Sequence, residues 1–384
     1  MGAHATRRQL FKAAGLTLAL LAAAEVLVRV HQRATHTFLR AVQQASDGDP
    51  RFWNQQFEAY PYVMHRTRPN QQFGTIHINA LGFRGPEVAI KKPPGRVRIV
   101  LLGGSVVWGT GASSDAQTIS AHLERRLNAG GSGRRFEVIN AGDSGYVTAQ
   151  EFITFWDRVL VLQPDWVITL DGYNDLYAGL TNRTAGYPQE FSALKEKLEL
   201  RGGVDYGLAM LRRLLQRSAL LRMLADTPRR VALRRTMDAE GVPALYADPG
   251  EVSCMYERNL RSVDVLARDA GVRTLFALQP MLGIGTKQIT EEEAAVLRDL
   301  NERVPGYTSY LRRTSDALSY ALGHLRRERQ ARILNLMDAF NDIRDRVFLD
   351  GCHFADAANQ RIAMRLEAAL RPALSVGTTP PEHP

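Results

Sequence analysis

A serine, an aspartate and a histidine follow runs of the sequence that predict strands, and these residue types together perform nucleophilic catalysis. Gly103-Gly104-Ser105 comes directly after the apolar residues 97 and 99–102. A short apolar run closed by glycines is typical of a buried parallel strand that ends in a tight turn. Ligands collect at the carboxyl ends of strands in open α/β sheets. We therefore predict that Ser105 is a nucleophile.

A serine hydroxyl needs a base that removes its proton, and that base works best when a carboxylate fixes its tautomer. Asp350 and His353 lie three residues apart in a loop that follows another predicted strand. Of the nine histidines, only His353 has an aspartate at this spacing in such a loop. The sequence predicts His353 as the general base and Asp350 as the carboxylate that orients it.

Attack on a carbonyl also needs hydrogen-bond donors where negative charge develops. Gly145 ends the segment Asn-Ala-Gly-Asp-Ser-Gly after a second predicted strand, and Asn174 follows a third. If these strands are neighbours, the Asn174 amide converges with the backbone N–H groups of Gly145 and Ser105. We expect these three donors to form an oxyanion hole. We interpret Asp175 as a residue that orients a loop or caps a helix, and the nearby Trp108 as a buried packing residue.

Alternating strand and helix patterns place these residues. Strands that alternate with helical segments at this spacing predict βαβ units, a parallel sheet of about five strands and right-handed crossovers. The predicted strands are 97–102, 136–139, 166–170, 274–278 and 333–337, and the predicted helical segments are 116–128, 148–162, 256–270, 291–328 and 355–370.

The net charge of +9 on 384 residues is concentrated locally, since residues 201–235 carry nine arginines against two aspartates. No nucleic-acid-binding motif accompanies this charge, so we expect no nucleic-acid partner. The only cysteines, Cys254 and Cys352, exclude a disulfide framework and a cysteine-based zinc site, and leave a single bridge open. We expect neither a metal nor a cofactor.

The amino terminus carries targeting information. Arg7-Arg8 precedes a mildly apolar run, 13–24, that ends in three alanines. Paired arginines, mild hydrophobicity and small residues resemble a twin-arginine export signal. A signal anchor that continues through residues 13–30 is the alternative. Both interpretations predict an exported, periplasmic protein, and they leave open whether the segment is cleaved or tethers the chain to the inner membrane.

Four segments resemble the sequence blocks of the SGNH (GDSL-type) hydrolase superfamily, in their order and in their placement after strands. These segments are Gly103-Gly104-Ser105, the loop that ends at Gly145, Gly172-Tyr-Asn174 and Asp350-Gly-Cys-His353. The resemblance implies a three-layer α/β/α, flavodoxin-like fold. It assigns Ser105 as nucleophile, His353 as base, Asp350 as its orienting group, and Gly145 and Asn174 as oxyanion donors.

One residue departs from the family pattern, because Gly104 stands where an aspartate usually precedes the serine. Membrane-anchored bacterial members look similar in this respect. They share Gly-Gly-Ser and an upstream Asn-x-x-Gly-x-Arg-Gly that resembles residues 79–85. Within that motif we interpret Arg84 as part of a structural salt bridge.

The sequence divides into five regions. We predict an export signal or anchor (1–30), an extension and linker (31–95), an SGNH-type hydrolase domain (96–371), a helical insertion within it (176–250) and a disordered tail (372–384). The leucine- and arginine-rich insertion either packs its apolar face on the domain or forms a lid or a face toward an anionic membrane or polymer.

The resemblance and the export signal together imply a function. We expect hydrolysis of carboxylic esters through an acyl-Ser105 intermediate, with O-acyl or O-acetyl groups on an envelope or secreted polysaccharide as substrate. Lipid esters are the nearest alternative. An acyltransferase that uses the same residues, and a non-catalytic carbohydrate-binding protein, also remain open.

Overall fold

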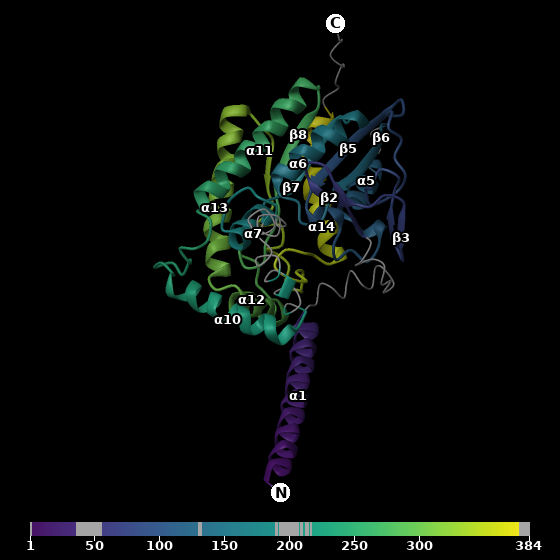
Figure 1. Cartoon of the computed structure of the whole chain (residues 1–384). Helices are drawn as coiled ribbons and strands as arrows, with labels where there is room; N and C mark the ends of the chain where they lie inside the picture. Colours follow the sequence, from purple (N-terminus) through teal and green to yellow (C-terminus); the bar gives the residue numbers. More distant parts are fainter. Residues whose placement is uncertain are drawn as a thin grey trace.

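A five-stranded parallel sheet forms the centre of the computed structural model, which describes residues 2–35, 56–129, 133–188 and 217–375 together with 191, 207, 210, 211 and 215 (Figure 1). The strands lie in the order β6-β5-β7-β8-β9. Their bounds are Arg96–Gly103 (β5), Arg135–Gly142 (β6), Trp166–Asp171 (β7), Arg273–Leu278 (β8) and Ile333–Asn335 (β9). The predicted parallel sheet of about five strands is confirmed.

The strand order reverses at β5. From β5 the chain goes to β6 on one side, and it then crosses to β7 on the other side. This is the flavodoxin-like order, in which ligands bind where the reversal separates the two crossovers. Gly103 at the end of β5 is paired with Gly142 of β6 and with Leu170 of β7. Ser105 therefore leaves the sheet at the position that the topology favours for chemistry.

Helices cover both faces of the sheet. Val100 and Leu102 of β5 belong to one buried cluster, and Ile99 and Leu101 to the other, as alternation along a strand requires. The first face is covered by α6 (Thr148–Thr154), α7 (Tyr173–Asn182), α11 (Pro249–Asp269) and α13 (Tyr307–Arg329). The second face is covered by α5 (Ile119–Ala129) and α14 (Asp356–Ser375). The predicted three-layer α/β/α architecture is confirmed.

Several predicted helical segments have different bounds in the structure. Residues 148–162 are not one helix, because α6 continues as a π-turn, Phe155–Val159, and a 3₁₀ turn, Leu160–Leu162. Residues 291–328 form two helices, α12 (Glu291–Arg303) and then α13. Helix α14 continues to Ser375, so the predicted tail begins inside a helix, and residues 376–384 lie outside the described part.

Residues 56–95 pack against the sheet domain. They form two hairpins, β1 (Phe57–Tyr60) with β2 (Met64–Thr67), and β3 (Gln71–Phe73) with β4 (Ile76–Ile78). Phe73, Ile76 and Ile78 form a buried cluster with Trp108, which lies in the short helix α4 (Ser105–Trp108). The part of the predicted extension that the structure describes therefore contacts the nucleophile's own helix.

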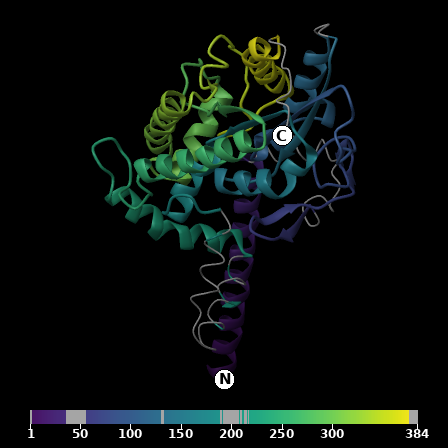
Figure 2. The same cartoon turned by 90° about the horizontal axis from the view of Figure 1, so that it is seen from above.

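The first helix, α1 (Gly2–Thr35), projects from the domain and meets α10 (Ala219–Arg235), as both views show (Figures 1 and 2). Glu25 of α1 accepts hydrogen bonds from the Ser218 hydroxyl and from the N–H groups of Ala219 and Leu220, at 2.8 to 2.9 Å. Among the described helices, none combines the length and the apolar character that crossing a membrane requires. Within the predicted insertion, residues 176–250, most of the residues between 189 and 216 lie outside the described part of the chain.

Candidate active site

Three side chains from distant parts of the chain form one hydrogen-bonded relay. The Nε2 atom of His353 lies 2.7 Å from the Ser105 hydroxyl oxygen, and its Nδ1 atom lies 2.7 Å from a carboxylate oxygen of Asp350. Because Asp350 accepts at Nδ1, Nδ1 carries the proton and Nε2 is left to accept the Ser105 proton. The structure thus brings together the three residues that the sequence singles out as a triad.

The loop that carries Asp350 and His353 folds around the carboxylate. The second oxygen of Asp350 accepts the backbone N–H groups of Cys352 and His353, at 2.9 and 2.8 Å. Gly351 passes close to two tyrosine hydroxyls, because a Cβ atom there would lie 2.4 Å from the oxygen of Tyr307 and 3.0 Å from that of Tyr173. Local sequence spacing does not reveal these tyrosines, which come from α7 and α13.

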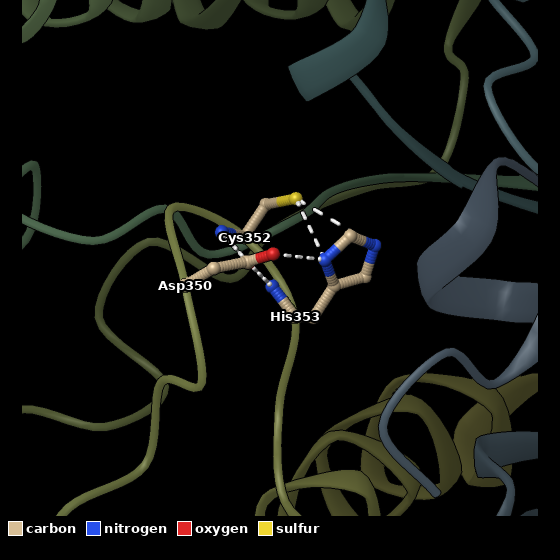
Figure 3. Close-up of side chains that lie close together, drawn as sticks. All are labelled: Asp350, Cys352 and His353. Atoms are coloured by element: carbon tan, nitrogen blue, oxygen red, sulfur yellow. Dashed lines mark hydrogen bonds and ion pairs between the residues drawn. The ribbon is translucent and has the colours of Figure 1, made fainter. Parts of the chain in front are cut away.

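The charge state of the loop follows from these contacts (Figure 3). Burial raises the pKa of Asp350, but the attraction of His353 and the hydrogen bonds from His353 and Cys352 outweigh burial and hold it below the usual value. Burial raises the pKa of the Cys352 thiol well above its usual value. Asp350 is therefore ionised at neutral pH, and Cys352 is a neutral buried thiol that is not bridged to Cys254.

Ser105 begins the four-residue helix α4, which Arg84 holds at its other end. The Arg84 guanidinium donates to the Gly109 carbonyl at 2.8 Å and to Asp115 at 2.7 Å, and it lies 4.8 Å from the centroid of the Trp108 ring. Arg84 and Trp108 are both buried. Arg84 thus forms the structural salt bridge that the sequence analysis favours, and Trp108 packs in the interior.

Asn174 and the Gly145 loop lie beside the nucleophile. Asn174 is buried at the start of α7 and donates from Nδ2 to the Tyr146 carbonyl at 2.8 Å. Gly145 adopts φ +80°, which favours glycine because it has no Cβ atom. A Cβ atom on Gly104 would lie 3.3 Å from the Tyr146 carbonyl and 2.1 Å from Asn174 Nδ2. Asn174 and the loop that contains Gly145 therefore lie next to the turn that carries Ser105.

The same contact gives a physical reason for glycine at position 104. We expect Gly104→Ala to lower kcat for ester hydrolysis by about tenfold, since the added methyl group displaces Asn174 Nδ2 and weakens one oxyanion donor. The colliding atom is the end of a side chain, so we expect the Tm to change little. Steady-state kinetics and thermal melts of Gly104→Ala and of the wild type test this. Gly323→Ala on α13 is the control, since the nearest side-chain atom to a Cβ atom there is Nη1 of Arg327, at 3.5 Å. An unchanged kcat would contradict the prediction.

The β1–β2 hairpin contacts residues 143–146, which we call the oxyanion loop because they include the expected oxyanion donor Gly145, and the sequence did not reveal this contact. Asp143 accepts from the backbone N–H and the hydroxyl of Thr67, at 2.7 and 2.8 Å. His65 Nε2 lies 3.0 Å from the Ser144 carbonyl, and the Tyr146 hydroxyl donates to the His65 carbonyl at 2.6 Å. These partners lie about 80 residues apart in the chain, so no local pattern joins them.

Three buried carboxyl groups, those of Glu151, Asp171 and Asp175, lie near one another at the start of α7, which also carries Asn174. Asp175 accepts from the N–H and hydroxyl of Thr148 at the start of α6, and Asp171 accepts from the Tyr256 hydroxyl at 2.6 Å. Burial raises the pKa of Asp171 to about 6 and that of Asp175 to about 7. Burial, with repulsion from both aspartates, raises the pKa of Glu151 well above its usual value. Asp175 thus anchors the helix that follows the oxyanion loop.

These raised pKa values predict how stability depends on pH. The folded state holds protons that the unfolded chain has lost between about pH 4 and pH 7, so folding is favoured at low pH and weakened as pH rises through that range. We expect Asp175→Asn, which mimics the neutral acid, to raise the Tm at pH 8 by about 2–4 °C and to leave it little changed at pH 5. Thermal melts at both pH values test this, with the exposed Asp345→Asn as control. An equal shift at both pH values would contradict it.

Two groups in the described part of the chain have metal-ligand chemistry. Asp350, Cys352 and His353 form one, and Glu257, His324 and Glu328 form the other. His353 already bonds Asp350 and Ser105 through its two nitrogens. The two His324 nitrogens lie 2.7 and 2.9 Å from Glu257 and Glu328, and Arg261 bridges both glutamates. In both groups the histidine nitrogens are therefore already bonded to neighbouring side chains.

Comparison with solved structures finds distant similarities. The chain is 12% identical to the acetyl xylan esterase AlAXEase (71% of this chain, 100% of that chain, TM-score 0.41). It is 16% identical to TesA (72% and 98%, TM-score 0.41). It is 14% identical to the acetylxylan esterase Axe2 from Geobacillus stearothermophilus (71% and 94%, TM-score 0.41). No curated protein matches the sequence.

The family comparison covers most of the chain. The model of the GDSL-like Lipase/Acylhydrolase family matches residues 101–361. That range begins within β5 and ends within α14, so it spans the sheet, the serine turn and the Asp350–His353 loop. The chain therefore belongs to the GDSL-like lipase/acylhydrolase family, the SGNH hydrolases, and is an ester hydrolase.

Proposed function

We propose that this enzyme hydrolyses carboxylic esters through a covalent acyl-Ser105 intermediate. The hydrogen-bonded relay from Ser105 through His353 to Asp350 carries the proposal, since each link measures 2.7 Å. His353 Nε2 takes the hydroxyl proton as Ser105 Oγ attacks the ester carbonyl. Asn174 Nδ2 and the N–H groups of Gly145 and Ser105 stabilise the resulting oxyanion.

The tetrahedral oxyanion then collapses to the acyl-enzyme, which water hydrolyses in a second stage. The alcohol leaves with the proton that His353 returns, and the acyl group stays on Ser105. His353 next takes a proton from water, the hydroxide attacks the acyl carbonyl, and the carboxylic acid leaves as Ser105 regains its proton. Asp350 stabilises the imidazolium in both stages without itself taking a proton.

We infer that the substrate is an O-acyl, in particular an O-acetyl, group on an envelope or secreted polysaccharide. The paired arginines and the following apolar run support export. The exposed leucines of α1 and the arginines of α10 support contact of the N-terminal region with an anionic inner-membrane surface from the periplasmic side. Lipid esters at such a surface are the competing substrate.

The decisive assay offers the purified enzyme p-nitrophenyl acetate, acetylated polysaccharides and phospholipids, and it measures the released acid. We expect acetate from p-nitrophenyl acetate and from an acetylated polysaccharide, with no loss of activity in chelator. Acetate transfer that requires an acceptor sugar would instead indicate an acyltransferase. Release of fatty acid from phospholipid, with none of the other substrates hydrolysed, would show that the substrate is a lipid. Absence of hydrolysis of every ester would contradict the proposal.

A further inference from the structure

Two large aromatic side chains, those of Tyr62 and Trp156, are exposed and lie edge to face at the β1–β2 hairpin. Tyr62 is 74% exposed in the turn of that hairpin, and Trp156 is 53% exposed after α6. Their ring centroids lie 6.2 Å apart with the ring planes inclined by 64°. Single exposed apolar side chains are ordinary, but exposed apolar side chains that lie together mark interaction sites.

Unusual backbone conformations hold both rings outward. Tyr62 adopts φ +65°, the left-handed region that costs a residue with a Cβ atom about 1–2 kcal/mol. Trp156 lies in the π-turn Phe155–Val159, in which Phe155 and Val159 are buried while Trp156 is not. Strained residues and π-helical turns are frequent at functional sites, and here one of each carries an exposed aromatic ring.

Polar groups lie on the same hairpin and on the same π-helical turn as the two rings. The Tyr60 hydroxyl donates to Asp157 at 2.9 Å, next to Trp156 in the chain. The Arg66 guanidinium lies 4.3 Å from the Tyr60 ring centroid and pairs with Glu58 at 2.7 Å. A sugar ring presents polarised C–H bonds that suit the negative faces of aromatic rings, and hydroxyls that suit carboxylates and guanidinium groups. The combination of rings with a charged border matches a saccharide better than a lipid tail.

The hairpin connects this surface to the active site. From Tyr62 to His65 the chain spans at most about 10 Å. His65 lies against the oxyanion loop, with its ring 5.4 Å from that of Tyr146, and the Tyr146 carbonyl accepts from Asn174. A polymer that rests on Tyr62 and Trp156 is therefore held close to the loop that receives the scissile ester.

We propose that Tyr62 and Trp156 form a saccharide-binding subsite that holds a polysaccharide chain while an acyl group on the same chain reaches Ser105. This inference rests on the proposed polysaccharide substrate and adds the surface that recognises it. Binding of the polymer at a distance from the triad raises the local concentration of acyl groups without taking part in the bond changes. Loss of the rings should therefore affect polymers and spare small esters.

Kinetics on two kinds of substrate test the subsite. The variants are Trp156→Ala and Tyr62→Asn, since asparagine tolerates the left-handed conformation; Tyr320→Ala, 72% exposed on α13, is the control. The small substrate is p-nitrophenyl acetate. The polymers are O-acetylated xylan, alginate and chitosan, which are neutral, anionic and cationic, and each carries its acetyl groups as esters. We expect each ring variant to raise KM for the preferred polymer by about 3- to 10-fold, from one aromatic contact, and to leave kcat/KM for p-nitrophenyl acetate unchanged.

Binding measurements separate this inference from the proposed function. The Ser105→Ala protein, with and without each ring substitution, is titrated with the same deacetylated polymers by calorimetry. Ring-dependent binding supports the subsite even if wild type releases no acetate, a result that would contradict only the esterase proposal. Hydrolysis of p-nitrophenyl acetate with ring-independent binding, or with no binding to any polymer, overturns the subsite alone. Ring-dependent binding to anionic phospholipid vesicles without an effect on polymers overturns it in favour of a membrane contact.

Discussion

Replacing Ser105 with alanine is expected to lower kcat for p-nitrophenyl acetate hydrolysis by about 10⁴- to 10⁶-fold. The hydroxyl that lies 2.7 Å from His353 Nε2 is the only atom of the relay placed to attack a carbonyl. No other residue of the relay can form the acyl intermediate once it is removed. Because Ser105 is half-buried at a helix start and its hydroxyl bonds one partner in the relay, we expect the Tm to shift by only a few degrees.

Non-additivity provides the sharper test of the relay. We expect His353→Ala to cost nearly as much as Ser105→Ala, and the double variant to be no slower than either single variant, since the two side chains act in one step. Ser253→Ala, a serine on α11 away from the site, is the matched control. Wild-type turnover in the Ser105→Ala protein, or losses that multiply in the double variant, would show that hydrolysis follows another route.

Removing the Asn174 amide is expected to lower kcat by about 10²- to 10³-fold while KM stays within about twofold. The amide lies within the first turn of α7 and bonds the carbonyl of Tyr146, so it is held in place before charge develops. A donor that strengthens only in the transition state changes kcat and leaves substrate binding intact. Asn174→Asp should cost more than Asn174→Ala, because a carboxylate repels the oxyanion.

Asn182→Ala is the matched control, since Asn182 ends the same helix and its amide nitrogen donates to the backbone carbonyls of Tyr187 and Pro188. Michaelis–Menten kinetics with p-nitrophenyl acetate and a thermal melt of each variant complete the experiment. A rise in KM with unchanged kcat would show that Asn174 binds the substrate equally in the ground state and the transition state, and would remove it from the oxyanion hole.

The sheet and the residues at its strand ends could be predicted because their signals are local. A buried strand shows itself as a short apolar run, and the residue after it lies at the carboxyl edge of the sheet by topology alone. Ser105, Asn174 and the Asp350–His353 pair all follow such runs. The order of these residues in the chain and their position after strands therefore predict a common site without any distance.

Other features depend on contacts that no local pattern encodes. Thr67 bonds Asp143 across 76 residues, and Asp175 bonds Thr148 across 27. Asp175 resembled a residue that orients a loop or caps a helix, and it does hold a helix start, but that of α6 rather than its own. The π-turn after α6 was also missed, because its apolar spacing differs little from that of a regular helix.

The contacts between the β1–β2 hairpin and the oxyanion loop affect where the boundary of the catalytic unit lies. The family match begins at residue 101, after the hairpin has ended. A fragment that starts at β5 would keep its nucleophile and base, yet it would lose the bonds from Thr67 and His65 that hold residues 143–146. A catalytic unit that keeps these contacts therefore has to include the β1–β2 hairpin, and a rearrangement that separates the hairpin from the sheet would retain the Ser105, His353 and Asp350 side chains without the contacts that support residues 143–146.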